Sequence, residues 1–341
     1  MPPSAKKAVA KAETALADKT HAALDAAAEA APAVLAAQDR RRSTLPPMLR
    51  FPLAATLSFA VASLGYSLLG EVTKGELAAV SRSQDTWGEV AVLAGWRMVE
   101  LSIGWFGELD SLDVATMDLL SHGPTLYLQT AFYNLSPVTA VSALIIDIIS
   151  AALPFYLLRP ISPSHRFVFS TTLFDPSLLL YTSALSSAIY AVTLVLSLTK
   201  ILPSILAVHF SGLPTLVPAY EASYFSTVPV TLAFGFAASV FIFAPFAAQG
   251  KVPEDEKLKD FDPATATLGE TVYANVWGYT AKTKVVIRRT AVAVAVTAIN
   301  TYLACTMTIY GISSAGATAY AAVWAFAALC TGLGLGLVGG D

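Results

Sequence analysis

Long apolar stretches alternate with polar, charged connections along this chain, and six of the apolar stretches are long enough to cross a bilayer. An α-helix rises about 1.5 Å per residue, so roughly 20 apolar residues cover the ~30 Å hydrocarbon layer. The pattern predicts an all-α, polytopic transmembrane helix bundle. Its six spans are expected at Met48–Gly70, Val138–Leu158, Pro176–Leu198, Val228–Ala248, Thr290–Tyr310 and Ala317–Val338.

The composition supports a membrane protein. Hydrophobic residues make up 55% of the 341 residues and charged residues only 13%, whereas soluble domains carry about 25% charged residues. A net charge of −3, without a basic stripe, argues against a nucleic-acid partner. Cys305 and Cys330 both fall in predicted spans, where a thiol behaves as a small hydrophobic group, so neither a disulfide nor a metal pair is expected.

Residues 1–47 are rich in alanine, with scattered lysines and acids and no large apolar face to bury. They are expected to form a cytosolic tail, partly helical or disordered. The scattered acids make a mitochondrial presequence the less favoured alternative. Residues 48–341 are then the transmembrane domain.

The basic residues predict an orientation. With six spans, seventeen of the 21 Lys and Arg residues lie on the side of the N-terminal tail, and seven of these lie in the connection 249–289. Because Lys and Arg are retained in cytosolic loops, both termini and the 249–289 loop are expected in the cytosol.

Segment 88–135 is ambiguous, because Val90–Phe106 and Leu112–Tyr133 are nearly apolar enough to span. One extra span would move the seven-charge loop to the opposite side, so the charges allow six or eight spans. Eight would bury Arg97 and Glu100, at a cost of about 2.5–3.5 kcal/mol for the arginine, partly offset by their i,i+3 spacing. We favour a non-cytosolic insert of amphipathic interfacial helices, lying on the membrane or against the bundle, with eight spans as the alternative.

Asp147 is the most informative ionisable residue, because it lies near the middle of the second predicted span. A carboxylate at that depth is costly unless it is neutral, paired or facing water, which makes it a candidate for an ion or proton path. The favoured alternative is a structural hydrogen bond to a polar neighbour such as Asn300. Arg97, Glu100, Asp147 and Asn300 together form the candidate intramembrane polar site.

Motifs for known catalytic chemistry are missing from the sequence: it contains no HExxH, GxSxG or Walker A pattern, and its four histidines are dispersed. No catalytic residue, metal site or cofactor is therefore predicted. Asp118 and His122, four residues apart, are expected to form a capping or surface pair rather than an acid–base pair.

The C-terminal GLGLVG lacks the strand and helix that a dinucleotide fingerprint needs. Its neighbouring small residues, Gly332, Gly336 and Gly340, instead favour close helix packing within the chain or between copies.

Three runs, GELAAVSRSQDTW, GWRMVELSIGWFGELDSLDVATMDLLSHGPTLYLQTAFY and LIIDIIS, resemble uncharacterised multi-pass membrane proteins of filamentous fungi. The resemblance covers residues 48–341. It implies an endomembrane protein and implies no activity.

Taken alone, the sequence favours a non-enzymatic organiser or subunit of an endomembrane complex or lipid environment, with the ER or another secretory-pathway membrane preferred to a mitochondrial one. Its expected partners are membrane lipids and a membrane protein or second copy bound through the C-terminal Gly-rich helix. The alternatives are a transporter or channel that uses Asp147, and a membrane-embedded enzyme that acts on lipid with His122 and Asp118.

The orientation is directly testable. A reporter fused to either terminus is expected to be accessible from the cytosol, whereas a tag inserted beside Gln84 is expected to be protected, because positive charge is retained inside. Protease protection in sealed vesicles measures this. Termini on opposite sides would show an odd number of spans and contradict the charge analysis.

Overall fold

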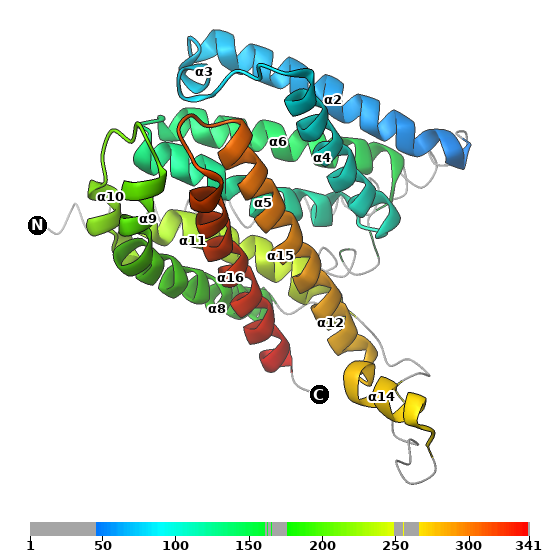
Figure 1. Cartoon of the computed structure of the whole chain (residues 1–341). Helices are drawn as coiled ribbons and strands as arrows, with labels where there is room; N and C mark the ends of the chain where they lie inside the picture. Colours follow the sequence, from blue (N-terminus) through cyan, green and yellow to red (C-terminus); the bar gives the residue numbers. More distant parts are fainter. Residues whose placement is uncertain are drawn as a thin grey trace, which may run out of the picture.

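The computed structural model describes residues 46–160, 176–248 and 266–339, together with Ser162, His165 and Asp255. Almost all of the predicted N-terminal tail therefore lies outside the described residues. The described part consists of helices joined by turns and irregular connections, and its β-type pairing is confined to two isolated bridges, Ser81 with Ile309 and Phe210 with Ile312. The predicted all-α bundle is confirmed (Figure 1).

Six helical stretches among the described residues are long and apolar enough to cross a membrane, one for each predicted span. Two of them continue through a π-helical turn, labelled η. Their elements are α2 (Pro47–Val72), α6 (Pro137–Leu158), α8 (Pro176–Leu196) with η1 (Ser197–Ile201) and α9 (Leu202–His209), α11 (Tyr224–Ala238) with η2 (Ser239–Phe243) and α12 (Ala244–Ala248), α15 (Ala281–Met307), and α16 (Ser314–Gly339).

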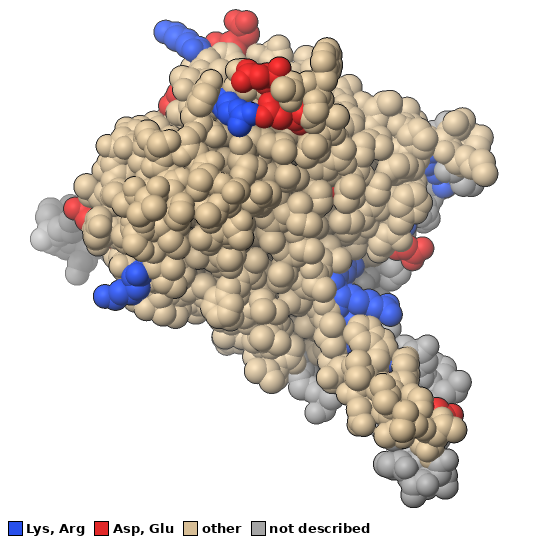
Figure 2. Space-filling model, in the orientation of Figure 1, with Lys and Arg blue, Asp and Glu red and all other residues tan. Residues whose placement is uncertain are grey.

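The spans pack mainly in pairs: α2 against α6, α8 against α11, and α15 against α16 (Figure 1). Charged residues on the face shown in Figure 2 lie towards the ends of the molecule and leave a broad uncharged area between them. A hydrocarbon layer accepts such a surface, since exposed charges there are costly.

Three short helices lie outside the spans: α3 (Glu76–Val80), α10 (Val217–Tyr220) and α14 (Leu268–Trp277). Figure 1 shows α14 beyond the start of α15, away from the body of the bundle. Its apolar side chains are largely exposed, with Leu268 at 84% and Val276 at 66%.

The ambiguous segment forms a helical hairpin, α4 (Trp87–Phe106) and α5 (Ser111–Phe132). Its turn lies beside the end of α6, because the Arg159 guanidinium donates to the carbonyl of Trp105 at 2.7 Å. A short turn joins α5 to α6, and the two helices pack against each other.

The segment was expected to lie on the membrane or against the bundle, and α5 packs among the other helices of the bundle. Leu128 and Phe132 are fully buried, and α5 packs against α6, α11 and α15. By length and hydropathy the described residues give six spans, so the eight-span alternative stays a prediction. The hydropathy of α5 is lowered by the same polar residues that its neighbours satisfy.

Pro124 shows how α5 is held in the centre. A proline within a helix has no N–H, so the carbonyl four residues earlier loses its helical partner. That carbonyl belongs to Leu120, and the hydroxyl of Thr297 on α15 donates to it at 3.1 Å. The carbonyl of Pro124 accepts a 2.7 Å bond from the Tyr320 hydroxyl on α16. Neighbouring helices thus satisfy backbone groups that would be costly in lipid.

Helices α8 and α11 come into close backbone contact at Gly235 of α11. A Cβ at this position would lie 2.6 Å from the Cα of Ser187 on α8, a contact with backbone that no side-chain movement relieves. Gly70, near the end of α2, has nothing within 4 Å of the same position.

The two glycines give a matched prediction. Gly235→Ala is expected to destabilise the fold by about 1–3 kcal/mol, because overpacking forces the helices apart. Gly70→Ala is expected to be neutral or to stabilise by roughly 0.4–1 kcal/mol through helix propensity. Thermal unfolding in detergent measures both. Equal effects of the two substitutions would contradict the close α8–α11 contact.

Candidate functional site

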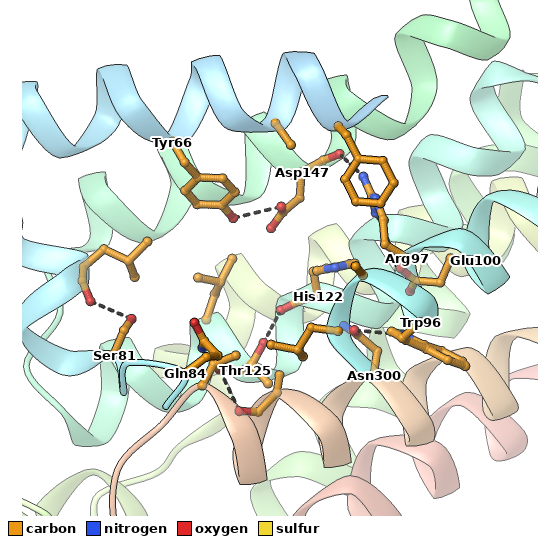
Figure 3. A pocket seen from close by; sticks show the side chains of 18 of the residues that line it. Tyr66, Ser81, Gln84, Trp96, Arg97, Glu100, His122, Thr125, Asp147 and Asn300 are labelled. Carbon is orange, nitrogen blue, oxygen red and sulfur yellow. Dashed lines mark hydrogen bonds and ion pairs between the residues drawn. The ribbon is translucent and has the colours of Figure 1, made fainter. Parts of the chain in front are cut away.

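A cavity of about 610 Å³ lies between α2, α4, α5, α6 and α15. Polar side chains from all five helices line it, as Figure 3 shows. They include Tyr66 from α2, Arg97 and Glu100 from α4, His122 and Gln129 from α5, Asp147 from α6 and Asn300 from α15. All four residues proposed from sequence, Arg97, Glu100, Asp147 and Asn300, therefore line the same cavity.

Arg97 connects the hairpin to the first pair of spans. Its Nη1 lies 2.8 Å from Oδ1 of Asp118 on α5. Its Nη2 donates to the Ser150 hydroxyl at 2.8 Å and to the backbone carbonyl of Asp147 at 3.3 Å, both on α6. One guanidinium with several fixed donors thus positions three helices.

Asp147 accepts a 2.8 Å hydrogen bond from the Tyr66 hydroxyl on α2. Asn300, its expected partner, instead accepts from the Trp96 indole at 3.1 Å and donates to the carbonyl of Ser121 at 2.9 Å. Asp147 thus has a polar partner on a neighbouring helix, but this partner is Tyr66 and not Asn300, the example suggested from sequence.

Glu100 is the least satisfied group in the site. Its side chain is only 4% exposed, and neither carboxyl oxygen has a hydrogen-bond donor among the described residues. Its closest cation is Arg97 at 3.5 Å. Oδ2 of Asp118 is likewise buried without a described donor. Carboxylate oxygens in this condition carry a large desolvation cost, which a proton or a bound cation removes.

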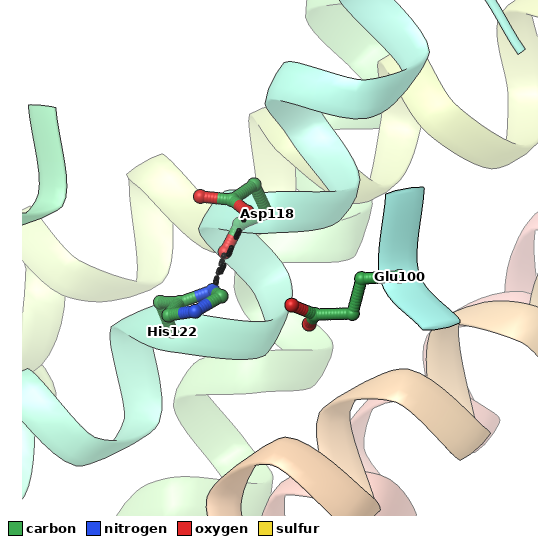
Figure 4. Close-up of side chains that lie close together, drawn as sticks. All are labelled: Glu100, Asp118 and His122. Carbon is green, nitrogen blue, oxygen red and sulfur yellow. Dashed lines mark hydrogen bonds and ion pairs between the residues drawn. The ribbon is translucent and has the colours of Figure 1, made fainter. Parts of the chain in front are cut away.

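His122 completes the cluster, and Figure 4 shows it beside Asp118 with Glu100 facing the pair. Its Nδ1 lies 2.8 Å from the Ser121 hydroxyl and 3.5 Å from Oδ1 of Asp118. The sequence favoured a capping or surface pair, but the Asp118 side chain is 3% exposed and that of His122 19%. The pair lies within the bundle, and His122 lines the cavity.

The charges of this cluster do not balance. Glu100 and Asp118 form ion pairs with Arg97, and Asp147, which contacts Arg97 through its backbone carbonyl, adds a third carboxyl group to the cluster. The site becomes neutral only with further positive charge, supplied by protons on the carboxyls and His122 or by a bound cation.

A metal ion is one possible source of that charge, because ligand atoms of Glu100, Asp118 and His122 lie within 4.8 Å of one another. However, the Arg97 guanidinium already lies 2.8 Å from Asp118. A dication would sit next to this fixed positive charge in a poorly screened site. Protons fit the arrangement better than a divalent metal.

A second cluster lies at the start of α5, where Asp110 caps the helix. Its Oδ1 accepts from the backbone N–H groups of Leu112 and Asp113, and its Oδ2 accepts from Ser162 N–H at 2.8 Å. His165 Nδ1 lies 2.7 Å from the same Oδ2. Asp113 in turn forms a two-pronged ion pair with Arg289 of α15.

This second cluster was not predicted from the sequence, although Asp110 and Asp113 have the spacing of a capping box at the start of α5. Ligand atoms of Asp110, Asp113 and His165 lie within 4.8 Å of one another, as in the first cluster. Because each acid has a basic partner, the cluster is best explained as a structural connection between the hairpin turn, the segment after α6 and α15.

The glycines of α16 pack within the chain. A Cβ at Gly332 would lie 2.7 Å from the Cβ of Thr290 on α15, and one at Gly336 would lie 3.4 Å from Val286. The close approach of α15 and α16 therefore uses these small residues. Gly340 lies outside the described residues, and association between copies stays a prediction.

Comparisons of the chain with protein-family models, with curated proteins and with solved structures gave no match. Its class rests on the fold: six long apolar helices make the chain a multi-pass membrane protein. The resemblance to fungal membrane proteins stays a prediction.

The Asp110–His165 pair predicts a pH dependence of stability. Burial opposes charge on both groups, but their mutual hydrogen bond lowers the pKa of Asp110 and raises that of His165, with Asp113 adding to the second shift. The Asp110 contribution is lost as pH falls through its lowered pKa. The His165 contribution is complete below the unfolded value of about 6.5 and is lost as pH rises through the raised pKa.

Asp110→Asn keeps a capping side chain but removes the charge. We expect it to destabilise the protein by about 1–3 kcal/mol, most strongly between roughly pH 4 and 6.5, with a smaller effect at higher pH. Thermal unfolding across this pH range measures the difference. The exposed Asp85→Asn is the control, and a pH-independent effect of Asp110→Asn would contradict the charged pair.

Proposed function

We propose that this protein is a proton-coupled transporter of a small polar solute, with the cavity as its binding site. The observation that carries the proposal is the excess of buried carboxyl groups over cations around Arg97. Transport proteins use such intramembrane acids as proton carriers, because neutralising and charging them changes which conformation is favoured.

The shape of the cavity supports a transporter over an open channel. Its lining extends from Ser81, Gln84 and Thr308, at the end of the bundle near α3, to Arg97 and Glu100. Gln84 is exposed, whereas Glu100 is buried (Figure 3).

Beyond Glu100 the helices close together. A Cβ at Gly104 would lie 2.9 Å from the Phe155 ring and 3.1 Å from Val114. Access from one end with tight packing at the other is the arrangement expected of one state of an alternating-access cycle.

The proposal includes the orientation inferred from charge. With cytosolic termini, the cavity opens towards the non-cytosolic side, and the Asp110–Arg289 cluster lies on the cytosolic side. We also propose an endomembrane location, for which the sequence is the only support.

A role in organising a complex, which the sequence favoured, has one supporting feature. The exposed apolar side chains of α14 offer a contact outside the bundle. If that role is correct, Val272→Ser with Tyr273→Ser should release a partner in gentle-detergent pull-downs while leaving solute flux unchanged. The lipid-acting enzyme is less well supported, because Asp118 forms an ion pair with Arg97 and is therefore a poor partner for His122 in acid–base catalysis.

Proton coupling is tested with the full chain in vesicles that contain a pH-sensitive dye. Pulses of candidate solutes, namely amino acids, sugars, nucleosides and small organic acids, are expected to change the internal pH with at least one class. Asp147→Asn and Glu100→Gln should each abolish the change while leaving folding intact, because neither amide can exchange a proton. Glu71→Gln, an exposed acid on α2, is the matched control.

A second measurement needs no solute. Infrared difference spectra recorded across pH should show a protonated carboxyl band that is lost in Glu100→Gln or Asp147→Asn. The absence of such a band in the parent protein between about pH 5 and 8 would mean that these groups carry no proton in the physiological range, and the proposal would fail.

A further inference from the structure

A second cavity, of about 600 Å³, lies beside the hairpin turn between α4, η2, α12 and α15. Apart from two arginines of α15, its lining residues are apolar or glycine. These include Ile103 and Leu109 from the hairpin, Phe241 and Pro245 from η2 and α12, and Val285 and Val292 from α15. A cavity of this composition favours a hydrocarbon chain over a polar solute.

Two arginines of α15 also line this cavity, and their environments differ. Arg289 forms an ion pair with Asp113 and lies over the Phe241 ring, 5.0 Å from its centroid. Arg288 is exposed, and no described side chain forms an ion pair with it. The cavity therefore combines an apolar interior with one available cation at its edge.

The position of Arg288 matches that of a lipid headgroup. It precedes the apolar run of α15 that begins near Thr290, at the end of the bundle that also holds the hairpin turn. Basic residues at the cytosolic edge of membrane helices attract anionic headgroups. Exposed Ala291 lines the cavity beside Arg288, which opens the apolar interior towards the surrounding lipid.

We infer that this cavity binds one anionic phospholipid, with an acyl chain between α4, η2 and α15 and its phosphate against Arg288. A free phosphate ion would leave the apolar interior of the cavity without an occupant, whereas an acyl chain fills it. The π-helical turn η2 supports a binding role, since such turns frequently occur at functional sites. This inference is independent of proton coupling, since it uses a different cavity.

The test uses the purified full chain, incubated in nanodiscs of phosphatidylcholine containing phosphatidic acid, and then native mass spectrometry of the retained lipids. The parent protein is expected to retain phosphatidic acid in preference to phosphatidylcholine. Arg288→Gln should reduce that preference about fivefold, the effect of one basic residue near a membrane surface. Val292→Trp, which fills the cavity, should reduce retention of the lipid itself.

Arg50→Gln removes a cation from the start of α2, away from the cavity, and should leave the preference unchanged. Size-exclusion profiles and helical content establish that each variant is folded. Equal preference in Arg288→Gln and the parent protein would overturn the inference, as would equal retention of the two lipids by the parent. Displacement of phosphatidic acid by millimolar inorganic phosphate would identify a free-anion site instead and would also overturn it.

Discussion

The constraint on which the rest of this structure depends is the burial of one guanidinium, that of Arg97. In an apolar environment its donors require fixed acceptors, and it finds them on Asp118 of α5 and on Ser150 and the Asp147 carbonyl of α6. The α4–α5 hairpin must therefore lie inside the bundle, beside α6. A buried ion pair adds little net stability, because desolvation offsets much of the attraction. Its main effect here is positional: it fixes the depth at which Glu100 faces the cavity.

A second set of contacts fixes α5 along its length. Asp110 caps its first turn. The hydroxyls of Thr297 and Tyr320 donate hydrogen bonds to the backbone carbonyls of Leu120 and Pro124. The helix can therefore carry Asp118 and His122 within the bundle without losing backbone hydrogen bonds to lipid. The polar residues that make α5 unsuitable for contact with lipid thus include Asp113 and Asp118, which form ion pairs with arginines of neighbouring helices.

The spans were predictable because each contains enough consecutive apolar residues to cross a bilayer, which is a property of the local sequence. The hairpin was not, because Arg97, Glu100 and Asp118 lower its hydropathy and their mutual pairing is visible only in three dimensions. Asp147 was identifiable from its position in a span. Its partner was not: Tyr66 lies 81 residues away, and no local pattern connects the two. His165, 55 residues from Asp110, escaped notice for the same reason.

The two charged clusters differ in how their acids are paired, and this difference indicates which of them has a structural role. At the start of α5 each acid has a basic partner, Asp110 with His165 and Asp113 with Arg289, although Nε2 of His165 is buried without a described partner. Around the cavity Glu100 and Asp118 both pair with Arg97, Asp147 adds a third carboxyl group, and both oxygens of Glu100 lack a described donor. A cluster whose acids are paired with bases gains little from a further cation, whereas a cluster with an excess of acid is stabilised by added positive charge. The excess of acid lies next to the cavity, where a proton or solute can reach it, which is why the function is assigned to this cluster.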